Sequence, residues 1–241
     1  MKRKGILPDF EGPFEFIHRR EKDLEIYFIS GTGEGECIFR VENKKPEFWN
    51  PVSGEIHEIV NYRLTEDGRT VIPVNLPNNG SVFVLFRNSY SSNHIVSVDG
   101  PGNDFEIKEN NEDVYKFNFW QSGNYNIKFS NNHIREIQVN TISSMDLKGP
   151  WRVRFMPGWG SPETTTFPRL IPWNNHSNIG IKYYSGTAIY NKKFKLNTSQ
   201  VKFPVRLKLG KVYNIAHVYL NGEDLGVVWT DPWTIEVKDA L

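Results

Sequence analysis

Apolar and polar side chains alternate at a period of two in segment after segment of this chain. Tyr125, Ile127 and Phe129, for example, alternate with asparagine, lysine and serine. Successive side chains of a β-strand point to opposite faces of its sheet, so this pattern predicts half-buried strands. Apolar residues do not repeat at helical spacing over any helix-length window. The sequence therefore predicts an all-β protein.

Turn signals separate the predicted strands, and the 7 Trp, 10 Tyr, 16 Phe, 19 Gly and 14 Pro suit short strands joined by tight turns. The strongest signal is Asn221-Gly222, because both central residues of a type I′ turn take positive φ. A hairpin is also predicted around Asn131-Asn132. Residues 24–29 and 36–41 are interpreted as a loose hairpin around the glycine-rich residues 30–35. Residues 81–87 are apolar on both faces, which predicts a central strand covered on both sides.

The alternation lapses between Asn140 and Gly149, and a new strand begins at Trp151. We place a domain boundary in this polar stretch. The chain of 241 residues is long enough for two domains of ordinary size. The expected architecture is two consecutive β-sandwich domains, at residues 1–145 and 146–241.

Charge is balanced over the whole chain, with 29 basic against 28 acidic residues. No net field favours nucleic acid or an anionic membrane, and no segment approaches the roughly 20 apolar residues of a membrane span. We expect neither as a partner. The single cysteine, Cys37, excludes an internal disulfide and a cysteine-based zinc site and is expected in the core.

Residues 1–4 are basic, but Pro8, Asp9, Glu11 and Pro13 follow where the apolar stretch of a signal peptide would lie. We expect no signal peptide in this chain, and its localisation is left open. If the chain belonged to an exported protein, it would lie in the periplasm or outside the cell.

Several aromatic residues lie where a sugar ring could stack on them. Residues 156–178 form a loop rich in Gly, Pro, Ser and Asn, and structureless loops of that length are uncommon unless functional. The candidate carbohydrate-binding residues are Trp159, Trp173, Tyr184, Trp229 and Trp233. Packing is the alternative for each of these rings. Trp151, Tyr190 and Tyr219 are instead expected in the core.

A glycosidase site needs two carboxylates about 5–10 Å apart across the scissile bond. The acidic residues here mostly fall in turns or alternate outward on strands, so no catalytic residue is assigned. The scattered histidines lack metal-ligand spacing, and no cofactor is expected. Asp99 and Asp104 form a candidate calcium site, with a plain turn as the alternative. The cluster His18-Arg19-Arg20 could bind a carboxylate or pack against another domain.

Three runs carry a family resemblance: Gly-Pro-Trp-Arg-Val-Arg-Phe at 149–155, Gly-Ile-Lys-Tyr-Tyr-Ser-Gly-Thr-Ala-Ile-Tyr at 180–190, and the run at 209–226 that contains Leu-Asn-Gly-Glu-Asp-Leu-Gly. They resemble the C-terminal sugar-binding domain of family 106 glycoside hydrolases, the α-L-rhamnosidases. Related domains occur in family 2 glycosidases such as β-galactosidases. The resemblance implies a galactose-binding-like jelly roll in residues 146–241.

The first half resembles the β domain that follows the catalytic barrel in those rhamnosidases. The matching segments are 8–10, 17–20, 23–28, 39–41, 46–54 and 82–86. In the family the barrel and its acids lie N-terminal to these segments, and this chain has no room for them. Residues 233–241 should lead into one further strand, so the jelly roll is expected to lack its last strand. Either marginal stability or association through that edge is then expected.

The resemblance implies a non-catalytic C-terminal portion of an α-L-rhamnosidase-like glycoside hydrolase that supports a barrel and contacts carbohydrate. Two alternatives stay open. One is a stand-alone carbohydrate-binding module for rhamnose- or galactose-containing polysaccharide. The other is a subunit of a split glycosidase. The expected partners are accordingly carbohydrate and a catalytic barrel domain or chain.

Overall fold

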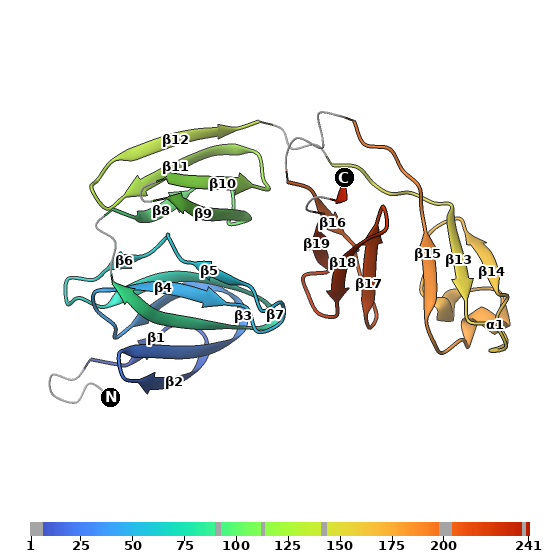
Figure 1. Ribbon diagram of the computed structural model, residues 1–241, viewed down its shortest axis with the longest axis horizontal. Coiled ribbons are helices and arrows are strands. Elements are labelled where there is room, and N and C mark those ends of the chain that lie inside the picture. The colour runs from blue at the N-terminus through green and yellow to red at the C-terminus, as the bar shows by residue number, and fades with distance from the viewer. Residues whose placement is uncertain (1–6, 90–92, 112–113, 141–143, 198–203, 238–239) are drawn as a thin grey trace. The chain divides into compact units, whose positions relative to one another are not determined.

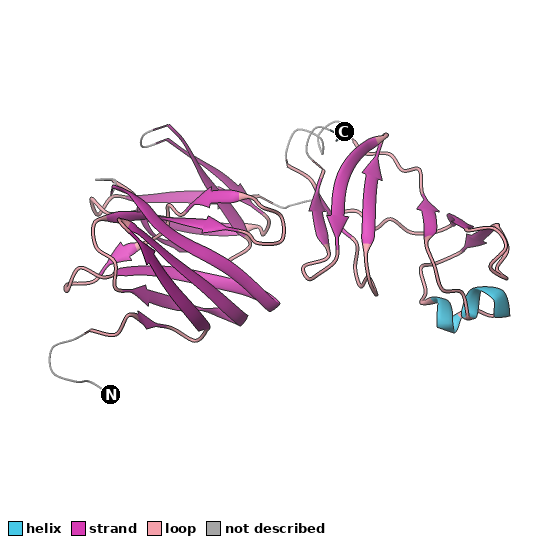
Figure 2. Ribbon diagram, turned by 60° about the horizontal axis from the view of Figure 1, so that its bottom comes forward, coloured by secondary structure: helices cyan, strands magenta, loops and turns pink. Residues whose placement is uncertain are grey.

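The computed structural model describes residues 7–89, 93–111, 114–140, 144–197, 204–237 and 240–241. The chain forms two compact units (Figure 1): a first unit of Met1–Ile142 with Pro204–Leu241, and a second unit of Ser143–Phe203. Antiparallel strands dominate both units (Figure 2), and the helical elements in the described part are α1 (Ile179–Lys182) and the 3₁₀ turn η1 (Trp173–Asn175). The prediction of a mostly β protein is confirmed. No helix in these ranges is long and apolar enough to cross a membrane.

A seven-stranded antiparallel sheet forms the N-terminal part of the first unit. Its path is β1-β3-β7-β4-β5, with β2 paired to β3 and β6 paired to β7. The bounds are β1 (Phe10–Glu11), β2 (Glu15–Glu21), β3 (Leu24–Phe39), β4 (Lys44–Trp49), β5 (Ile56–Glu58), β6 (Arg63–Leu64) and β7 (Thr70–Ser89). As predicted, residues 81–87 lie in a central strand, and Val84, Leu85 and Phe86 are all buried.

The hairpin predicted around residues 30–35 is wrong. β3 runs through the glycine-rich segment as one strand of 16 residues and pairs with β7 on both sides of it. The register shifts between Gly31 and Gly33, and Gly33 has φ +99°. These glycines therefore form an irregularity in a continuous ladder, which lets the strand bend without reversing.

The core of this sheet is built from alternate residues of its strands. Tyr27, Ile29, Cys37 and Phe39 of β3 are fully buried, and Phe39 packs edge-on against Tyr27 with ring centroids 4.9 Å apart. Cys37 is thus in the core, as predicted, and burial raises the pKa of its thiol to about 12. The thiol stays protonated at neutral pH.

Two smaller sheets follow along the chain. β8 (Ile95–Asp99), β11 (Gly123–Phe129) and β12 (Ile134–Val139) form a three-stranded sheet in the order β12-β11-β8, and β9 (Phe105–Asn111) pairs with β10 (Val114–Phe119). Ile95, Ile127 and Phe129 are central to the hydrophobic cluster of this region. The hairpin predicted around Asn131-Asn132 is confirmed, and Asn132 has φ +64°.

The C-terminal residues of the first unit form two strand pairs. β16 (Arg206–Lys208) pairs with β19 (Thr234–Glu236), and β17 (Ala216–Leu220) pairs with β18 (Glu223–Val228). Asn221 and Gly222 have φ of 52° and 91°, which confirms the predicted turn with both central residues at positive φ.

The second unit is a three-stranded sheet in the order β14-β13-β15, with α1 and η1. The strands are β13 (Trp151–Phe155), β14 (Thr164–Phe167) and β15 (Ala188–Asn191). The prediction that residues 156–178 form a structureless loop is wrong, because three β-branched threonines and Phe167 form a strand that pairs with β13. Prolines at 162 and 168 flank this strand, so in the sequence it looks like part of a loop. The domain limits at 145 and 146 stay a prediction.

Candidate carbohydrate-contacting surface

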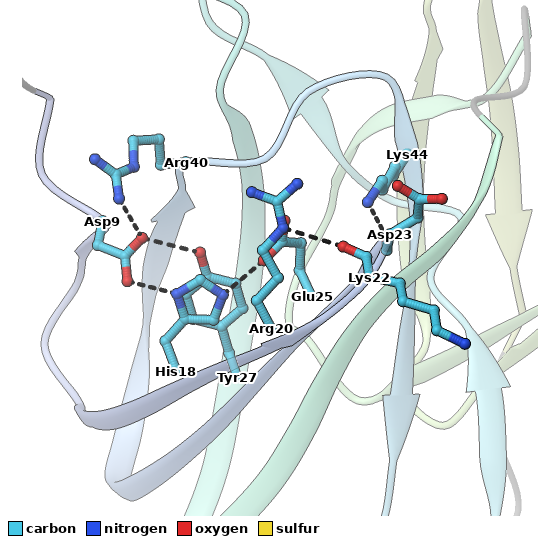
Figure 3. Close-up of polar contacts among 9 residues, drawn as sticks. All are labelled: Asp9, His18, Arg20, Lys22, Asp23, Glu25, Tyr27, Arg40 and Lys44. Atoms are coloured by element: carbon cyan, nitrogen blue, oxygen red, sulfur yellow. Dashed lines mark hydrogen bonds and ion pairs between the residues drawn. The ribbon is translucent and has the colours of Figure 1, made fainter.

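The His18 ring lies between two carboxylates in the N-terminal sheet (Figure 3). Its Nδ1 is 2.7 Å from Asp9 Oδ2, and its Nε2 is 2.8 Å from Glu25 Oε2. The ring stacks on Tyr27 with centroids 4.0 Å apart and an interplanar angle of 5°. Both ring nitrogens are thus engaged within the chain, which leaves neither for a ligand.

Two arginines complete the His18 network. Arg40 pairs with Asp9 at 3.0 Å, and Arg20 pairs with Glu25 at 3.1 Å. Burial, and then the charge of Asp9, raise the pKa of the Tyr27 hydroxyl well above its ordinary value. The carboxylate that Arg20 binds therefore belongs to its own chain, and the network ties the segment before β1 to β2 and β3.

Replacing His18 with alanine is expected to lower the free energy of unfolding by about 1–2 kcal/mol, because two carboxylates lose a shared partner and Tyr27 loses its stacked ring. Urea denaturation followed by circular dichroism measures this. Arg19→Ala is the control, since the exposed side chain of Arg19 has no hydrogen-bond or ion-pair partner within the described ranges. Equal stabilities for the two variants would contradict the structural role of His18.

Two of the five candidate rings contribute to the core of the second unit. Tyr184 is buried, and its hydroxyl donates to the Thr187 carbonyl at 2.9 Å and accepts from the Met156 amide at 3.2 Å. Trp173 packs against the same cluster and donates its indole N–H to the Tyr190 hydroxyl at 2.6 Å. Both side chains have polar partners within their own unit.

The other three candidates are more accessible. Trp159 of the second unit is 63% exposed, Trp229 of the first unit is 54% exposed, and Trp233 is half-buried. Trp151 and Tyr190 pack on the core of the second unit, as predicted.

The prediction that Tyr219 is a core residue is wrong, because it is 58% exposed. Its neighbour Val218 points inward instead. Residues 215–220, Ile-Ala-His-Val-Tyr-Leu, carry apolar side chains at both odd and even positions. The sequence pattern therefore does not indicate which face of the strand is buried.

Six exposed side chains share one side of the β17–β18 hairpin, because strand neighbours two apart and residues opposite each other in the register point the same way. His217 lies opposite Val227 and Tyr219 lies opposite Asp224, while Val218 and Val228 point to the buried side. We call this surface the hairpin face: Ile215, His217, Tyr219, Asp224, Val227 and Trp229.

A short polar chain orders the hairpin face. The Asp224 carboxylate accepts from His217 Nε2, at 2.8 and 2.9 Å from its two oxygens, and from the Gly226 amide at 2.8 Å. With Nε2–H donating, Nδ1 of His217 accepts from the Tyr219 hydroxyl at 3.2 Å. The Gly226 amide, and then His217, hold the pKa of the Asp224 carboxyl below its usual range. Asp224 is therefore a fixed, charged acceptor beside exposed rings.

Sequence reasoning selected Trp229 on this face but missed His217 and Asp224. The two residues are seven apart, and only the hairpin register brings them together. The predicted Asn221-Gly222 turn was the one signal that could have paired them.

A pocket of about 400 Å³ opens in the second unit, within the size range of small-ligand sites. Its lining combines apolar and polar side chains and includes no carboxylate. We call it the loop pocket, and its lining is Phe167, Pro168, Arg169, Ile171, Asn175, His176 and Ser177.

The calcium candidates have other partners in the chain. Asp104 pairs with Arg206 at 2.8 Å, and Asp99 accepts a hydrogen bond from Ser97 at 3.2 Å. Nowhere in the described part of the chain do three His, Cys, Asp or Glu side chains gather as a metal site would require.

Residues 1–64 match the family model for glycoside hydrolase family 106, alpha-L-rhamnosidase. A curated protein of Formosa agariphila, named "Putative beta-glucuronidase", is 34% identical in an alignment of 112 residues that covers 44% of this chain and 10% of that protein. The solved structure of a rhamnosidase from Novosphingobium sp. PP1Y matches 98% of this chain with a TM-score of 0.69 and 26% identity, over 20% of its own length. The chain thus contains a family 106 rhamnosidase-like region and spans a tenth and a fifth of these two proteins.

Proposed function

We propose that this chain is a non-catalytic, β-rich part of an α-L-rhamnosidase-like glycoside hydrolase, which supports a catalytic barrel and contacts carbohydrate through the hairpin face. One observation carries the proposal: nearly the whole chain matches one fifth of a rhamnosidase chain. The division into a β-sandwich through residue 145 and a galactose-binding-like jelly roll from residue 146 belongs to the same proposal.

The hairpin face suits a sugar ring chemically. A pyranose presents an apolar C–H face and a rim of hydroxyls, so its sites combine an exposed ring with fixed polar groups. Trp229 and Tyr219 offer exposed rings, and the Asp224 carboxylate is held in place by Gly226 and His217. The polar groups are thus ordered before any ligand arrives, which lowers the entropic cost of binding.

The carboxylates support a non-catalytic role. Glycoside hydrolysis uses two carboxyl groups about 5–10 Å apart around the bond that breaks. Asp224 is the single carboxylate on the hairpin face, and the loop pocket is lined by none. Neither surface offers an acid and a base to the same sugar.

Affinity electrophoresis tests carbohydrate contact at the hairpin face. The full chain is run through native gels that contain neutral polysaccharides bearing rhamnose or galactose. We expect retardation in at least one gel, and Trp229→Ala should weaken binding about tenfold, which corresponds to about 1.4 kcal/mol. Tyr219→Ala should weaken it in the same direction.

Matched controls exist for both variants. Trp159→Ala removes a similarly exposed tryptophan, and Tyr183→Ala removes a tyrosine that is 74% exposed, both in the second unit. These controls should migrate like the wild type. Retardation that is absent in every gel, or reduced equally by Trp159→Ala and Trp229→Ala, would reject the hairpin face as the contact.

Hydrolysis of a nitrophenyl α-L-rhamnoside tests the non-catalytic role. We expect no nitrophenol release above background from the purified chain, because neither the hairpin face nor the loop pocket pairs two carboxylates. Reproducible turnover by the chain would overturn this part of the proposal. Turnover that arises only after co-expression with a separate barrel would instead favour the split glycosidase.

A further inference from the structure

The charges of the chain are divided unequally between its two units. Residues 143–203 contain nine Lys or Arg against two acidic residues, Asp146 and Glu163, which gives a net charge of +7. Because the whole chain carries +1, the first unit carries −6. A unit of this size with this net charge attracts anionic partners over distances set by ionic strength.

Two arginines of the second unit project from the same face of its sheet. Arg152 and Arg154 alternate on β13 with the buried Val153 and Phe155, so both side chains point outward. Because a strand rises about 3.3–3.4 Å per residue, the Cα atoms of the two arginines lie roughly 6.7 Å apart along β13.

The strands on either side add no negative charge to this face. The register places Thr166 and Asn191 beside Arg152, and Thr164 and Ile189 beside Arg154. The face therefore combines two cations with hydroxyl and amide groups.

The third arginine of the unit lines the loop pocket. Arg169 is the pocket's one fixed charge, and Asn175, His176 and Ser177 supply neutral hydrogen-bonding groups around it. The His176 ring stacks on Phe167 with centroids 4.9 Å apart, and its Nδ1 accepts from the Asn178 amide at 3.0 Å. These contacts hold the ring of His176 at the pocket wall.

None of these three arginines pairs with a carboxylate in the described part of the chain, whereas most arginines of the first unit do. The paired ones are Arg20, Arg40, Arg63, Arg69, Arg87 and Arg206. The second unit therefore keeps its guanidinium groups available.

We propose that the second unit binds the anionic groups of an acidic polysaccharide through Arg152, Arg154 and Arg169. This inference rests on the proposed carbohydrate contact and names its chemical class: a sugar polymer that carries carboxylate or sulfate groups. A guanidinium binds either oxyanion with two parallel hydrogen bonds. The neutral groups beside the arginines match sugar hydroxyls, which favours an acidic polysaccharide over a nucleic acid.

Biolayer interferometry of the full chain tests the inference with four immobilised polymers: polygalacturonate for carboxylate, dextran sulfate for sulfate, dextran as the neutral control and duplex DNA as the alternative polyanion. We expect binding to one or both acidic polysaccharides, no binding to dextran, and a loss of affinity between about 0.05 M and about 0.5 M NaCl. Arg152→Gln/Arg154→Gln should bind about tenfold more weakly, and Arg169→Gln should also bind more weakly.

Arg19→Gln/Arg135→Gln is the matched control, because it removes the same charge from exposed arginines of the first unit whose side chains have no partner within the described ranges. It should bind like the wild type, and circular dichroism confirms that each variant folds. The inference is overturned by equal losses in the two double variants, by binding to dextran as tight as to the acidic polymers, by no binding at all, or by tighter binding to DNA.

The hairpin-face variant Trp229→Ala separates this inference from the proposed function. It should bind the acidic polymers like the wild type, while its retardation in neutral gels is reduced. Loss of acidic-polymer binding in Trp229→Ala would show that the hairpin face, and not the second unit, makes the contact.

Discussion

Replacing Phe39 with alanine is expected to lower the free energy of unfolding of the first unit by about 3–5 kcal/mol, the usual cost of removing a buried aromatic ring. Phe39 is fully buried. Its ring packs against Tyr27 at 4.9 Å and against Phe10 and Phe86 at 5.3 Å. Truncation would leave a cavity where three aromatic rings meet.

Urea denaturation followed by circular dichroism measures the loss at Phe39. Phe16→Ala on β2 is the matched control, because Phe16 is 40% exposed and should cost about 1 kcal/mol or less. If the two variants unfolded at the same urea concentration, that result would contradict the prediction that Phe39 lies at the centre of the core of the first unit.

Replacing Gly180 with alanine is expected to destabilise the second unit by about 3 kcal/mol, because overpacking against a backbone cannot be relieved by a rotamer change. A Cβ at this position would lie 2.1 Å from the Gly160 carbonyl oxygen and 3.1 Å from Ser161 Cα. The loop that follows β13 and contains Gly160 and Ser161 therefore packs directly on α1.

Hydrogen exchange of the β13, β14 and β15 amides reports on the second unit by itself. Gly180→Ala should speed exchange in these strands, while Ile179→Ala, a change at an exposed neighbour on α1, should not. Unchanged exchange in Gly180→Ala would mean that the loop and α1 can separate without cost.

The strands were predictable where the sequence pattern is local. Alternation identifies β11 and β12, and Asn221-Gly222 identifies the β17–β18 turn. The glycine-rich part of β3 was misinterpreted because its pairing partner, β7, lies about 40 residues further along the chain. Glycines that end a strand and glycines that form an irregularity within a ladder look the same in a sequence.

The candidate site was predictable only in part. Trp229 is exposed and stays a candidate, but exposure could not be assigned from sequence for Trp173 or Tyr184, which pack within their own unit. The His217–Asp224 contact depends on hairpin register. The balanced charge of the whole chain also concealed the excess in residues 143–203, because the limits of that unit follow from spatial contacts.

Nuclear magnetic resonance titration of the ¹⁵N-labelled chain with methyl α-L-rhamnoside and methyl β-D-galactoside tests most directly whether the hairpin face contacts carbohydrate. Saturable shifts with one of these sugars are expected for the amides of β17 and β18 and for the indole N–H of Trp229. In Trp229→Ala the amide shifts should require about tenfold more sugar. The absence of saturable shifts on the hairpin with both sugars, or shifts confined to other strands, would contradict the proposed function.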